Sequence, residues 1–100
     1  MNPAETDPSG ADPIRLVIEE TFDLHGIRPS DVKESVREYL RLAHEKAYRR
    51  VRIIHGKGMG ERQRMVHHLL LQSPLVSTFC LAPPALGGWG ATVIWLVPSH

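Results

Sequence analysis

The sequence is short of cysteine and of long apolar runs, and each shortage excludes a class of protein. Cys80 is the one cysteine among 100 residues, so no intramolecular disulfide can form and a reducing, cytoplasmic setting is expected. Its neighbours Phe79 and Leu81 are apolar, which predicts a buried thiol. No apolar stretch approaches the roughly 20 residues of a membrane-spanning helix, and no signal peptide is recognisable. A membrane is therefore not an expected partner.

Two kinds of functional motif are also missing. The pattern G-x-x-x-x-G-K-[ST] does not occur, so ATP hydrolysis on a P-loop is not expected. Neither C-x-x-C nor H-E-x-x-H is present, and the adjacent His67 and His68 would diverge on a helix. A structural zinc site is therefore not expected.

The charge that is present is unevenly distributed. Residues 1–43 hold five Arg and Lys against nine Asp and Glu, a net charge of −4, whereas residues 44–100 hold seven against two, a net charge of +5. All seven of those cations lie between positions 46 and 64. A basic patch of this kind favours a polyanionic partner over a small neutral substrate, although a solvated charged surface would give the same composition.

The length fits a single domain. Residues 1–12 are rich in Pro, Asp and small residues without periodicity, which predicts a disordered tail in front of a domain over residues 13–100. Apolar and β-branched residues predict a short edge strand over residues 14–18, a turn at 19–20 and a second short strand over 21–24.

Helical spacing of apolar residues predicts two amphipathic helices. The first would begin at Ser30 or Asp31 as N-cap, with Glu34 completing a capping box, and would bury Val32, Val36, Tyr39, Leu40, Ala43 and Ala47. The second would bury Met65, Val66, Leu69 and Leu70 and end before Pro74.

Three further segments have strand character, over residues 51–54, 76–81 and 91–97. The loop over residues 82–88 holds two prolines and two glycines and cannot continue a ladder. The resulting order, β-α-β-α-β-β, predicts an α/β two-layer sandwich with a four-stranded mixed sheet and two helices.

The stretch from Val51 to Glu61, V-R-I-I-H-G-K-G-M-G-E, has the strongest functional pattern. A strand leads through a Gly-rich turn into a helix, whose N-terminal N–H groups and dipole attract an anion. Lys57 adds a positive charge and His55 a group that exchanges protons near neutral pH. The pattern predicts a phosphate site, and a plain turn whose glycines supply unusual backbone angles is the alternative.

Three motifs resemble those of the Smr (small MutS-related) domain family, in its stand-alone form. Residues 22–26, F-D-L-H-G, resemble L-D-x-H-G, with Phe22 where leucine is usual; residues 55–58, H-G-K-G, resemble H/T-G-x-G; and residues 87–92, G-G-W-G-A-T, resemble G-G-x-G-A-T. The resemblance spans about residues 20–97. It implies a fold similar to the C-terminal domain of bacterial translation initiation factor three.

The resemblance also implies nucleic-acid binding with endonuclease activity, either DNA nicking or RNA cleavage, in a bacterial protein. The first alternative is a module that binds nucleic acid or the ribosome without cleaving. A weaker one is binding of a small phosphorylated metabolite, against which the width of the basic cluster argues. The assembly expected is a monomer or a weak homodimer.

The candidate catalytic residues are Asp23, His25 and His55. Asp23 and His25 lie two apart at a strand end and share one face, so His25 is expected to act as general acid or base while Asp23 orients it or recruits Mg²⁺ or Mn²⁺ transiently. A structural pair is the alternative. His55 would either transfer a second proton or hydrogen-bond across its turn. A two-metal nuclease normally uses several carboxylates, and only Asp23 is available here. Cleavage driven by histidine needs no metal, but it uses the 2′-hydroxyl as nucleophile and is therefore restricted to RNA.

The candidate nucleic-acid-binding residues surround the Gly-rich turn and the late Gly-rich loop. Glycines would admit a phosphate close to the backbone, cations would pair with it, and an exposed tryptophan would stack on an unpaired base. These residues are Gly56, Lys57, Gly58, Gly60, Arg62, Arg64 and Trp89. Trp89 could instead pack over a helix end and Arg64 could be solvated, whereas Trp95 is expected in the core.

Overall fold

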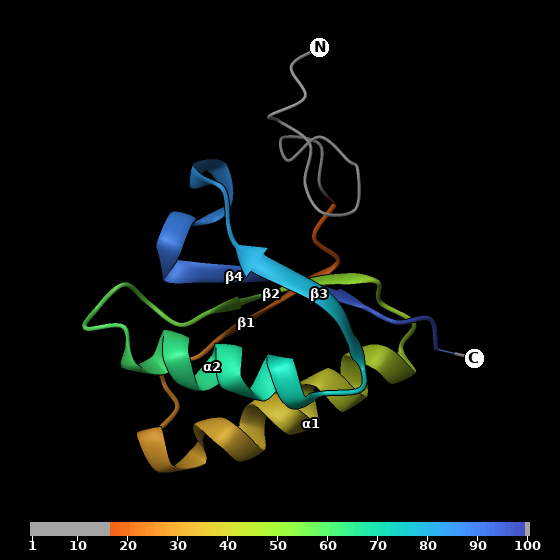
Figure 1. The fold of residues 1–100 in the computed structure, drawn as a ribbon, viewed down its shortest axis with the longest axis horizontal. Coiled ribbons are helices and arrows are strands. Elements are labelled where there is room, and N and C mark those ends of the chain that lie inside the picture. The colour runs from red at the N-terminus through yellow and green to blue at the C-terminus, as the bar shows by residue number, and fades with distance from the viewer. Residues whose placement is uncertain (1–16, 100) are drawn as a thin grey trace.

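The computed structural model describes residues 17–99 and forms one sheet with two helices (Figure 1). A 3-10 turn over Pro29–Asp31 precedes the first helix, and two more, over Pro84–Leu86 and Gly88–Gly90, precede the last strand. The strands and helices follow in the order β1 (Glu20–Asp23), α1 (Val32–Glu45), β2 (Arg50–Ile54), α2 (Glu61–Gln72), β3 (Val76–Leu81) and β4 (Ala91–Leu96).

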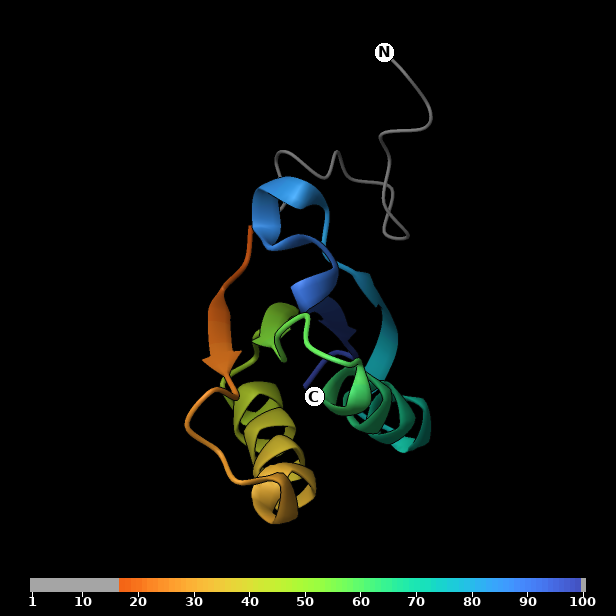
Figure 2. The same cartoon turned by 90° about the vertical axis from the view of Figure 1, so that its left-hand side faces the viewer.

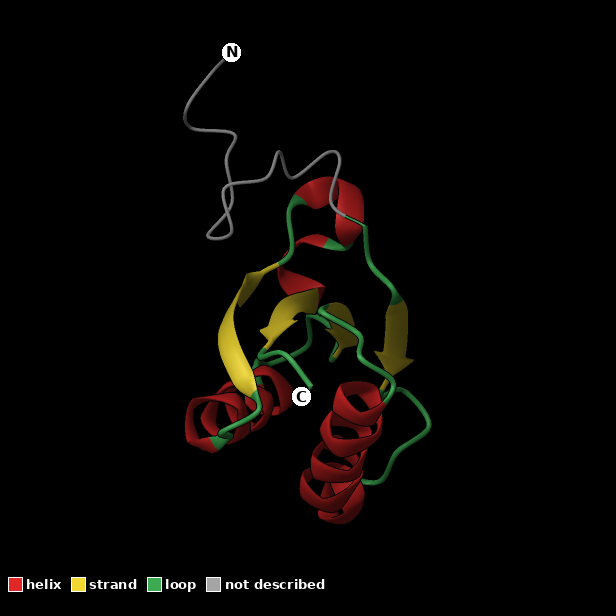
Figure 3. Cartoon of the chain, turned by 90° about the vertical axis from the view of Figure 1, so that its right-hand side faces the viewer, coloured by secondary structure: helices red, strands yellow, loops and turns green. Residues whose placement is uncertain are grey.

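The sheet is mixed, with spatial order β1-β2-β4-β3. β1 pairs with β2 in parallel, whereas β4 pairs antiparallel with both β2 and β3. Both helices lie on the same face of the sheet (Figures 2 and 3). The two-layer α/β sandwich with a four-stranded mixed sheet, predicted from the order of elements, is confirmed.

The main core lies between the sheet and the two helices. Alternate strand residues point into it, because side chains of a strand point to opposite faces in turn. Burying each large aliphatic side chain contributes about 1.5–3 kcal/mol. The residues of this core are Leu24, Val32, Val36, Leu40, Ala43, Val51, Ile53, Val66, Leu69, Leu70, Ile94 and Leu96.

A smaller apolar cluster covers the opposite face of the sheet. It contains Ala82, Ala91, Val93 and Trp95, and Trp95 is 6% exposed, as its position inside a strand predicts. Cys80 lies at the margin of this cluster and is half-buried. The fully buried thiol expected from its apolar neighbours is therefore not found, because β3 is an edge strand of the sheet.

The N-terminal strand differs from the prediction. Val17 and Ile18 are not in a strand, and residues 14–16, like the predicted disordered tail over 1–12, lie outside the described residues. β1 begins at Glu20, where a turn was expected. The reason is that one side-chain oxygen of Glu19 accepts hydrogen bonds from the backbone N–H groups of Arg49 and Arg50 (2.6 and 2.9 Å), which leads the chain directly into register with β2.

The ends of α1 also differ from the prediction. The capping box is absent, because the Asp31 carboxylate accepts from Arg28 Nε (3.2 Å) and makes no capping bond to the helix backbone. At the other end the helix stops at Glu45, and Ala47, expected on its buried face, is exposed with a left-handed φ of 63°. This reversal directs the chain back toward β2, at a cost of about 1–2 kcal/mol for a residue with a Cβ.

Within residues 17–99, no helix is long and apolar enough to cross a membrane.

Candidate functional site

The sheet topology brings the three sequence motifs to one edge. β1 and β2 are parallel and in register from Glu20 opposite Val51 to Asp23 opposite Ile54, so the residues that follow them emerge side by side. β4 runs antiparallel and begins at this same edge, with Ala91 opposite Ile54. His25, His55 and the late Gly-rich loop, far apart in sequence, therefore meet.

Backbone hydrogen bonds join the second and third motifs directly. The carbonyl oxygen of Gly90 accepts from the N–H groups of His55 (3.0 Å) and Gly56 (2.9 Å). A Cβ at Gly90 would lie 3.1 Å from Lys57 Cγ and 3.6 Å from the Lys57 nitrogen. A side chain at position 90 would therefore press on Lys57, and the two loops form one closely packed unit.

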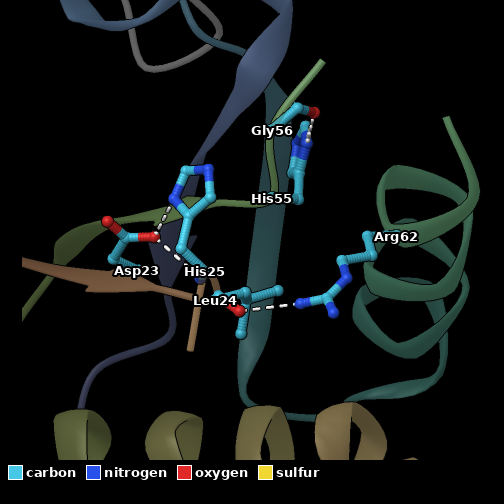
Figure 4. Close-up of polar contacts among 6 residues, drawn as sticks. All are labelled: Asp23, Leu24, His25, His55, Gly56 and Arg62. Carbon is cyan, nitrogen blue, oxygen red and sulfur yellow. Dashed lines mark hydrogen bonds and ion pairs between the residues drawn. The ribbon is translucent and has the colours of Figure 1, made fainter. Parts of the chain in front are cut away.

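Asp23 and His25 form an exposed hydrogen-bonded pair (Figure 4). Asp23 Oδ1 accepts from the backbone N–H of His25 (2.9 Å) and lies 2.6 Å from its Nδ1. The backbone hydrogen bond of His25, followed by that of its ring, holds the pKa of the Asp23 carboxyl below its usual range. A ring that donates from Nδ1 to this carboxylate keeps Nε2 available as an acceptor.

The free nitrogen of His25 lies beside the Gly-rich turn. His25 Nε2 is 3.8 Å from where a Cβ of Gly56 would be, and the His25 side chain is 73% exposed. Its ring borders a hollow of about 420 Å³ lined by His25, His55, Gly56, Lys57, Gly58, Met59, Gly60, Glu61 and Arg62. A ligand in this hollow could therefore reach a proton-accepting nitrogen.

His55 has the opposite environment. It is 6% exposed, and both ring nitrogens have partners: Nδ1 lies 3.1 Å from the carbonyl oxygen of Gly56 and Nε2 lies 2.9 Å from Thr92 Oγ1. Because a carbonyl oxygen can only accept, Nδ1 must carry the proton and Nε2 must accept from the Thr92 hydroxyl. Burial lowers the pKa of His55, which favours this neutral form.

His67 on α2 completes this buried network. Its Nε2 lies 2.7 Å from the same Thr92 hydroxyl, whose proton is already given to His55, so His67 must donate. Burial, followed by the proximity of His55, lowers the pKa of His67. Thr92 itself is fully buried, so one hydroxyl ties β4 to both the Gly-rich turn and α2.

The glycines of the turn have different tasks. Gly56 (φ 84°) and Gly60 (φ 82°) adopt left-handed conformations that favour glycine, and Gly60 is the N-cap of α2. Gly58 has no such φ, and a Cβ there would meet nothing within 4 Å. Gly58 and Lys57 are exposed on the rim of the hollow.

The predicted basic residues do not form a single patch. Arg49 and Arg50 lie at the start of β2, at the opposite end of the strand from His55, and donate to the carbonyl oxygens of Leu96 and Val17. Arg52 is likewise bound, to Thr21 Oγ1 and to the Leu86 carbonyl oxygen. The cations left near the hollow are Lys57, Arg62 and Arg64.

Arg62 and Arg64 differ from each other. Arg62 Nη1 donates to the carbonyl oxygen of Leu24 (2.7 Å), which fastens α2 to the end of β1 (Figure 4). Part of the Arg62 guanidinium is thus used in this hydrogen bond. Arg62 therefore acts on the site first by holding Leu24, and with it the adjacent His25, in place. Arg64 is exposed beside Gly60.

Trp89 lies on the third motif and is 66% exposed, so it does not pack over the end of a helix. It borders a second hollow, which shares Lys57 with the first.

Within the described part of the chain, the residues do not fit a resident metal ion. Among residues 17–99, no group of three or more His, Cys, Asp or Glu side chains could hold one. Asp23 offers a single carboxylate, one oxygen of which already accepts two hydrogen bonds from His25. No chemical step is therefore assigned to a bound cation.

Sequence reasoning missed Thr92 and His67. The alternation of β4 places Thr92 on the same face as Ile94 and Leu96, toward the helices, and this pattern could have identified a buried hydroxyl in need of partners. His67 lies one helical turn from Leu70 and beside Val66, both buried. No sequence signal links these two residues to His55.

The chain matches the family model of the Smr domain over residues 22–97. It is 34% identical over 79 residues to an endonuclease MutS2 from Thermomicrobium roseum, and 39% identical over 82 residues to one from Staphylococcus aureus. These alignments cover 79% and 82% of this chain. The chain spans only about a tenth of the length of these curated relatives, 10% and 11%.

Solved structures of related proteins are also similar. The Smr domain of Thermus thermophilus MutS2 superimposes with a TM-score of 0.75 at 32% identity, covering 79% of this chain and 99% of that one. YdaL, a stand-alone small MutS-related protein from Escherichia coli, gives a TM-score of 0.66 at 27% identity, covering 76% and 63%. Motifs, fold and relatives agree: this chain belongs to the Smr domain family.

Proposed function

We propose that this domain binds nucleic acid and cleaves RNA, with His25 as the proton-transferring residue. The observation that carries the proposal is the Asp23–His25 pair at the rim of the hollow, with its Nε2 beside the Gly-rich turn. The relatives named endonuclease MutS2 give independent support for activity on a phosphodiester.

The strand would be held by its phosphates. Lys57 is exposed on the rim of the hollow, and the first N–H groups of α2 have no partner within their helix. Together a point charge and a helix N-terminus favour a phosphate there. Glu61, in the first turn of α2, also lines the hollow, so the phosphate would lie on the Lys57 side.

The chemical step needs a proton acceptor near the 2′-hydroxyl. His25 Nε2 would take that proton while the 2′-oxygen attacks the adjacent phosphorus and the bond to the 5′-oxygen breaks. The imidazolium or water then returns a proton to the leaving oxygen, which leaves a 2′,3′-cyclic phosphate and a 5′-hydroxyl. Asp23 holds the Nδ1–H form and stabilises the imidazolium. Because the nucleophile of this step is a 2′-hydroxyl, the proposed substrate is RNA.

Binding without cleavage is the second candidate, and one observation favours it. Cleavage of this kind requires both removal and delivery of a proton, and a second histidine commonly shares the work. His55 is buried with both nitrogens hydrogen-bonded, so His25 acts alone. A domain with a single exposed histidine at the hollow could hold an RNA, or a nucleoprotein such as the ribosome, through Lys57 without cutting it.

The test is a gel assay of the purified chain on a structured RNA and on a supercoiled plasmid, each with Mg²⁺, Mn²⁺ or EDTA. We expect cleavage of RNA in EDTA, with cyclic phosphate ends, and a loss of at least about 100-fold in His25→Ala. An RNA with a single 2′-deoxy nucleotide at the mapped cleavage site should resist cutting there.

Three results would contradict parts of this proposal. Equal cutting by His25→Ala would remove His25 from the chemistry or reveal a contaminating nuclease. Metal-dependent nicking of the plasmid would show that a cation recruited from solution, and not His25 alone, drives cleavage. Salt-sensitive gel shifts without any cleavage product would contradict the cleavage proposal and support binding without cleavage.

A further inference from the structure

The second hollow adjoins the first and differs from it in chemistry. It encloses about 450 Å³, within the range of small-molecule sites. Apart from Lys57, its walls are apolar side chains and glycine backbone. The lining residues are Lys57, Leu81, Ala82, Pro84, Gly87, Gly88 and Trp89.

Trp89 is exposed to solvent on a loop that is held firmly. Its neighbour Gly90 accepts the two hydrogen bonds from His55 and Gly56, and its other neighbour Gly88 donates to the Pro83 carbonyl oxygen (3.0 Å). An indole presented on a fixed backbone binds a flat partner with little loss of side-chain entropy.

We propose that this second hollow binds an unpaired nucleobase, stacked on the indole of Trp89, and that the domain thereby selects single-stranded segments. The inference rests on the proposed function, since the base belongs to the same strand whose phosphate lies at Lys57. Lys57 lines both hollows, and the carbonyl oxygen of Gly90, next to Trp89, accepts from the N–H of Gly56, next to Lys57, so neighbouring nucleotides of one strand can occupy both.

The choice of occupant follows from the chemistry of the walls. A nucleobase presents a flat apolar face to the indole and is followed along its strand by a phosphate, which complements the Lys57 ammonium. A base inside a duplex is already stacked on both sides and would have to be extruded, at a cost of a few kcal/mol. The hollow therefore favours loops, bulges and single strands over continuous duplex.

The test compares strands with and without bases. Fluorescence anisotropy at low salt would measure binding of a short single-stranded deoxyoligonucleotide, which the proposed chemistry cannot cut, and of the same backbone made abasic at its interior positions. The wild-type chain should bind the complete strand about five- to 100-fold more tightly. Trp89→Leu should bind both strands equally, at the wild-type affinity for the abasic one.

Two control variants separate this subsite from the phosphate site. Lys57→Ala should weaken both strands by the same factor and keep their ratio. Leu71→Ala removes a similarly exposed apolar side chain, 75% exposed on α2, away from both hollows, and should change neither affinity. Binding of the complete strand should also quench the emission of Trp89, and Trp89→Leu, which retains only the buried Trp95, should lose that quenching.

Three other outcomes would contradict the base subsite or the proposed function. If Trp89→Leu still discriminates bases like the wild type, the base subsite is wrong while the proposed binding stands. If it weakens both strands equally, Trp89 contacts the backbone and the inference is again wrong. If the folded wild-type chain binds neither these strands nor RNA, the proposed function fails and the subsite with it.

Discussion

Two histidine clusters lie at the same edge of the sheet in opposite environments. The His25 side chain is 73% exposed and bonded to a carboxylate, with Nε2 facing a hollow. His55 is 6% exposed, and with His67 it shares the hydroxyl of Thr92. The same residue type is thus available for proton transfer in one cluster and confined to neutral hydrogen bonding in the other.

The two clusters therefore have different expected roles, the exposed one in the proposed chemistry and the buried one in holding the loops together. An exposed hydrogen-bonded pair contributes little to stability, and in the proposed function the Asp23–His25 pair acts on the ligand instead. A buried polar network is expensive to leave incomplete, so the His55–Thr92–His67 network holds the loops in place. Perturbing each cluster should therefore have separable effects.

The largest expected effect on stability comes from the buried network. Thr92→Val replaces the shared hydroxyl by a methyl group and leaves Nε2 of the buried His55 and Nε2 of the half-buried His67 without their partner, so the free energy of unfolding should fall by about 2–3 kcal/mol. Urea denaturation measures the change. Thr92→Ser keeps the hydroxyl and should recover most of the loss; equal stability of Thr92→Val and the wild type would contradict the network.

The next effect is on the exposed pair. Asp23→Asn removes the charge that stabilises the imidazolium of His25 and should slow RNA cleavage by at least about tenfold, with little change in the urea midpoint. The matched control is Glu38→Gln on α1, another exposed carboxylate with a lowered pKa, in this case because of the hydrogen bond from Arg41. Cleavage that survives Asp23→Asn unchanged would reduce the pair to a structural contact.

A smaller effect is expected at the phosphate side of the exposed cluster. Lys57→Ala should lower the slope of log affinity against log salt by about one unit, since one phosphate contact is lost. Lys33 is an exposed lysine on α1, so Lys33→Ala serves as the control of equal charge. If both variants give the same slope, Lys57 is one charge among many and not a specific contact.

The last expected effect is a pH dependence of stability. Burial lowers the pKa values of His55 and His67 in the folded chain below their ordinary value of 6.5. At mildly acidic pH the unfolded chain therefore binds more protons than the folded chain. Stability is then fully present above about pH 7 and is lost as pH falls through 6.5 toward the lowered values. The melting temperature should drop between pH 7 and 5, and His67→Gln should flatten the curve. A wild-type curve without slope over this interval would contradict neutral buried histidines.

The fold could be predicted from the sequence because its signals are local and periodic. The apolar positions of α1 and α2, the strand run at Val51–Ile54 and the Gly- and Pro-rich loop before Ala91 fix the elements and their order. The motifs then place Asp23 and His25 at a strand end. What failed were features decided by long-range contacts, such as the start of β1, which Glu19 sets through bonds to Arg49 and Arg50.

The site shows the same division. Proximity of Asp23 and His25 follows from a two-residue spacing, but the burial of His55 depends on Thr92, 37 positions away, and on His67 of α2. The basic run over positions 46–64 looks like one patch in sequence, yet β2 carries Arg49 and Arg50 to the far end of the sheet. The order of charged residues along the sequence therefore does not show which of them share a surface in the fold.

The most direct test of the account is the RNA cleavage rate of His25→Ala beside that of Thr92→Val, each measured in EDTA at a temperature where circular dichroism shows both folded. We expect His25→Ala to keep wild-type stability within about 0.5 kcal/mol and to lose cleavage. Thr92→Val should lose stability and, while folded, still cleave. The reverse pattern, with cleavage retained in His25→Ala and lost in folded Thr92→Val, would contradict the assignment of chemistry to the exposed pair.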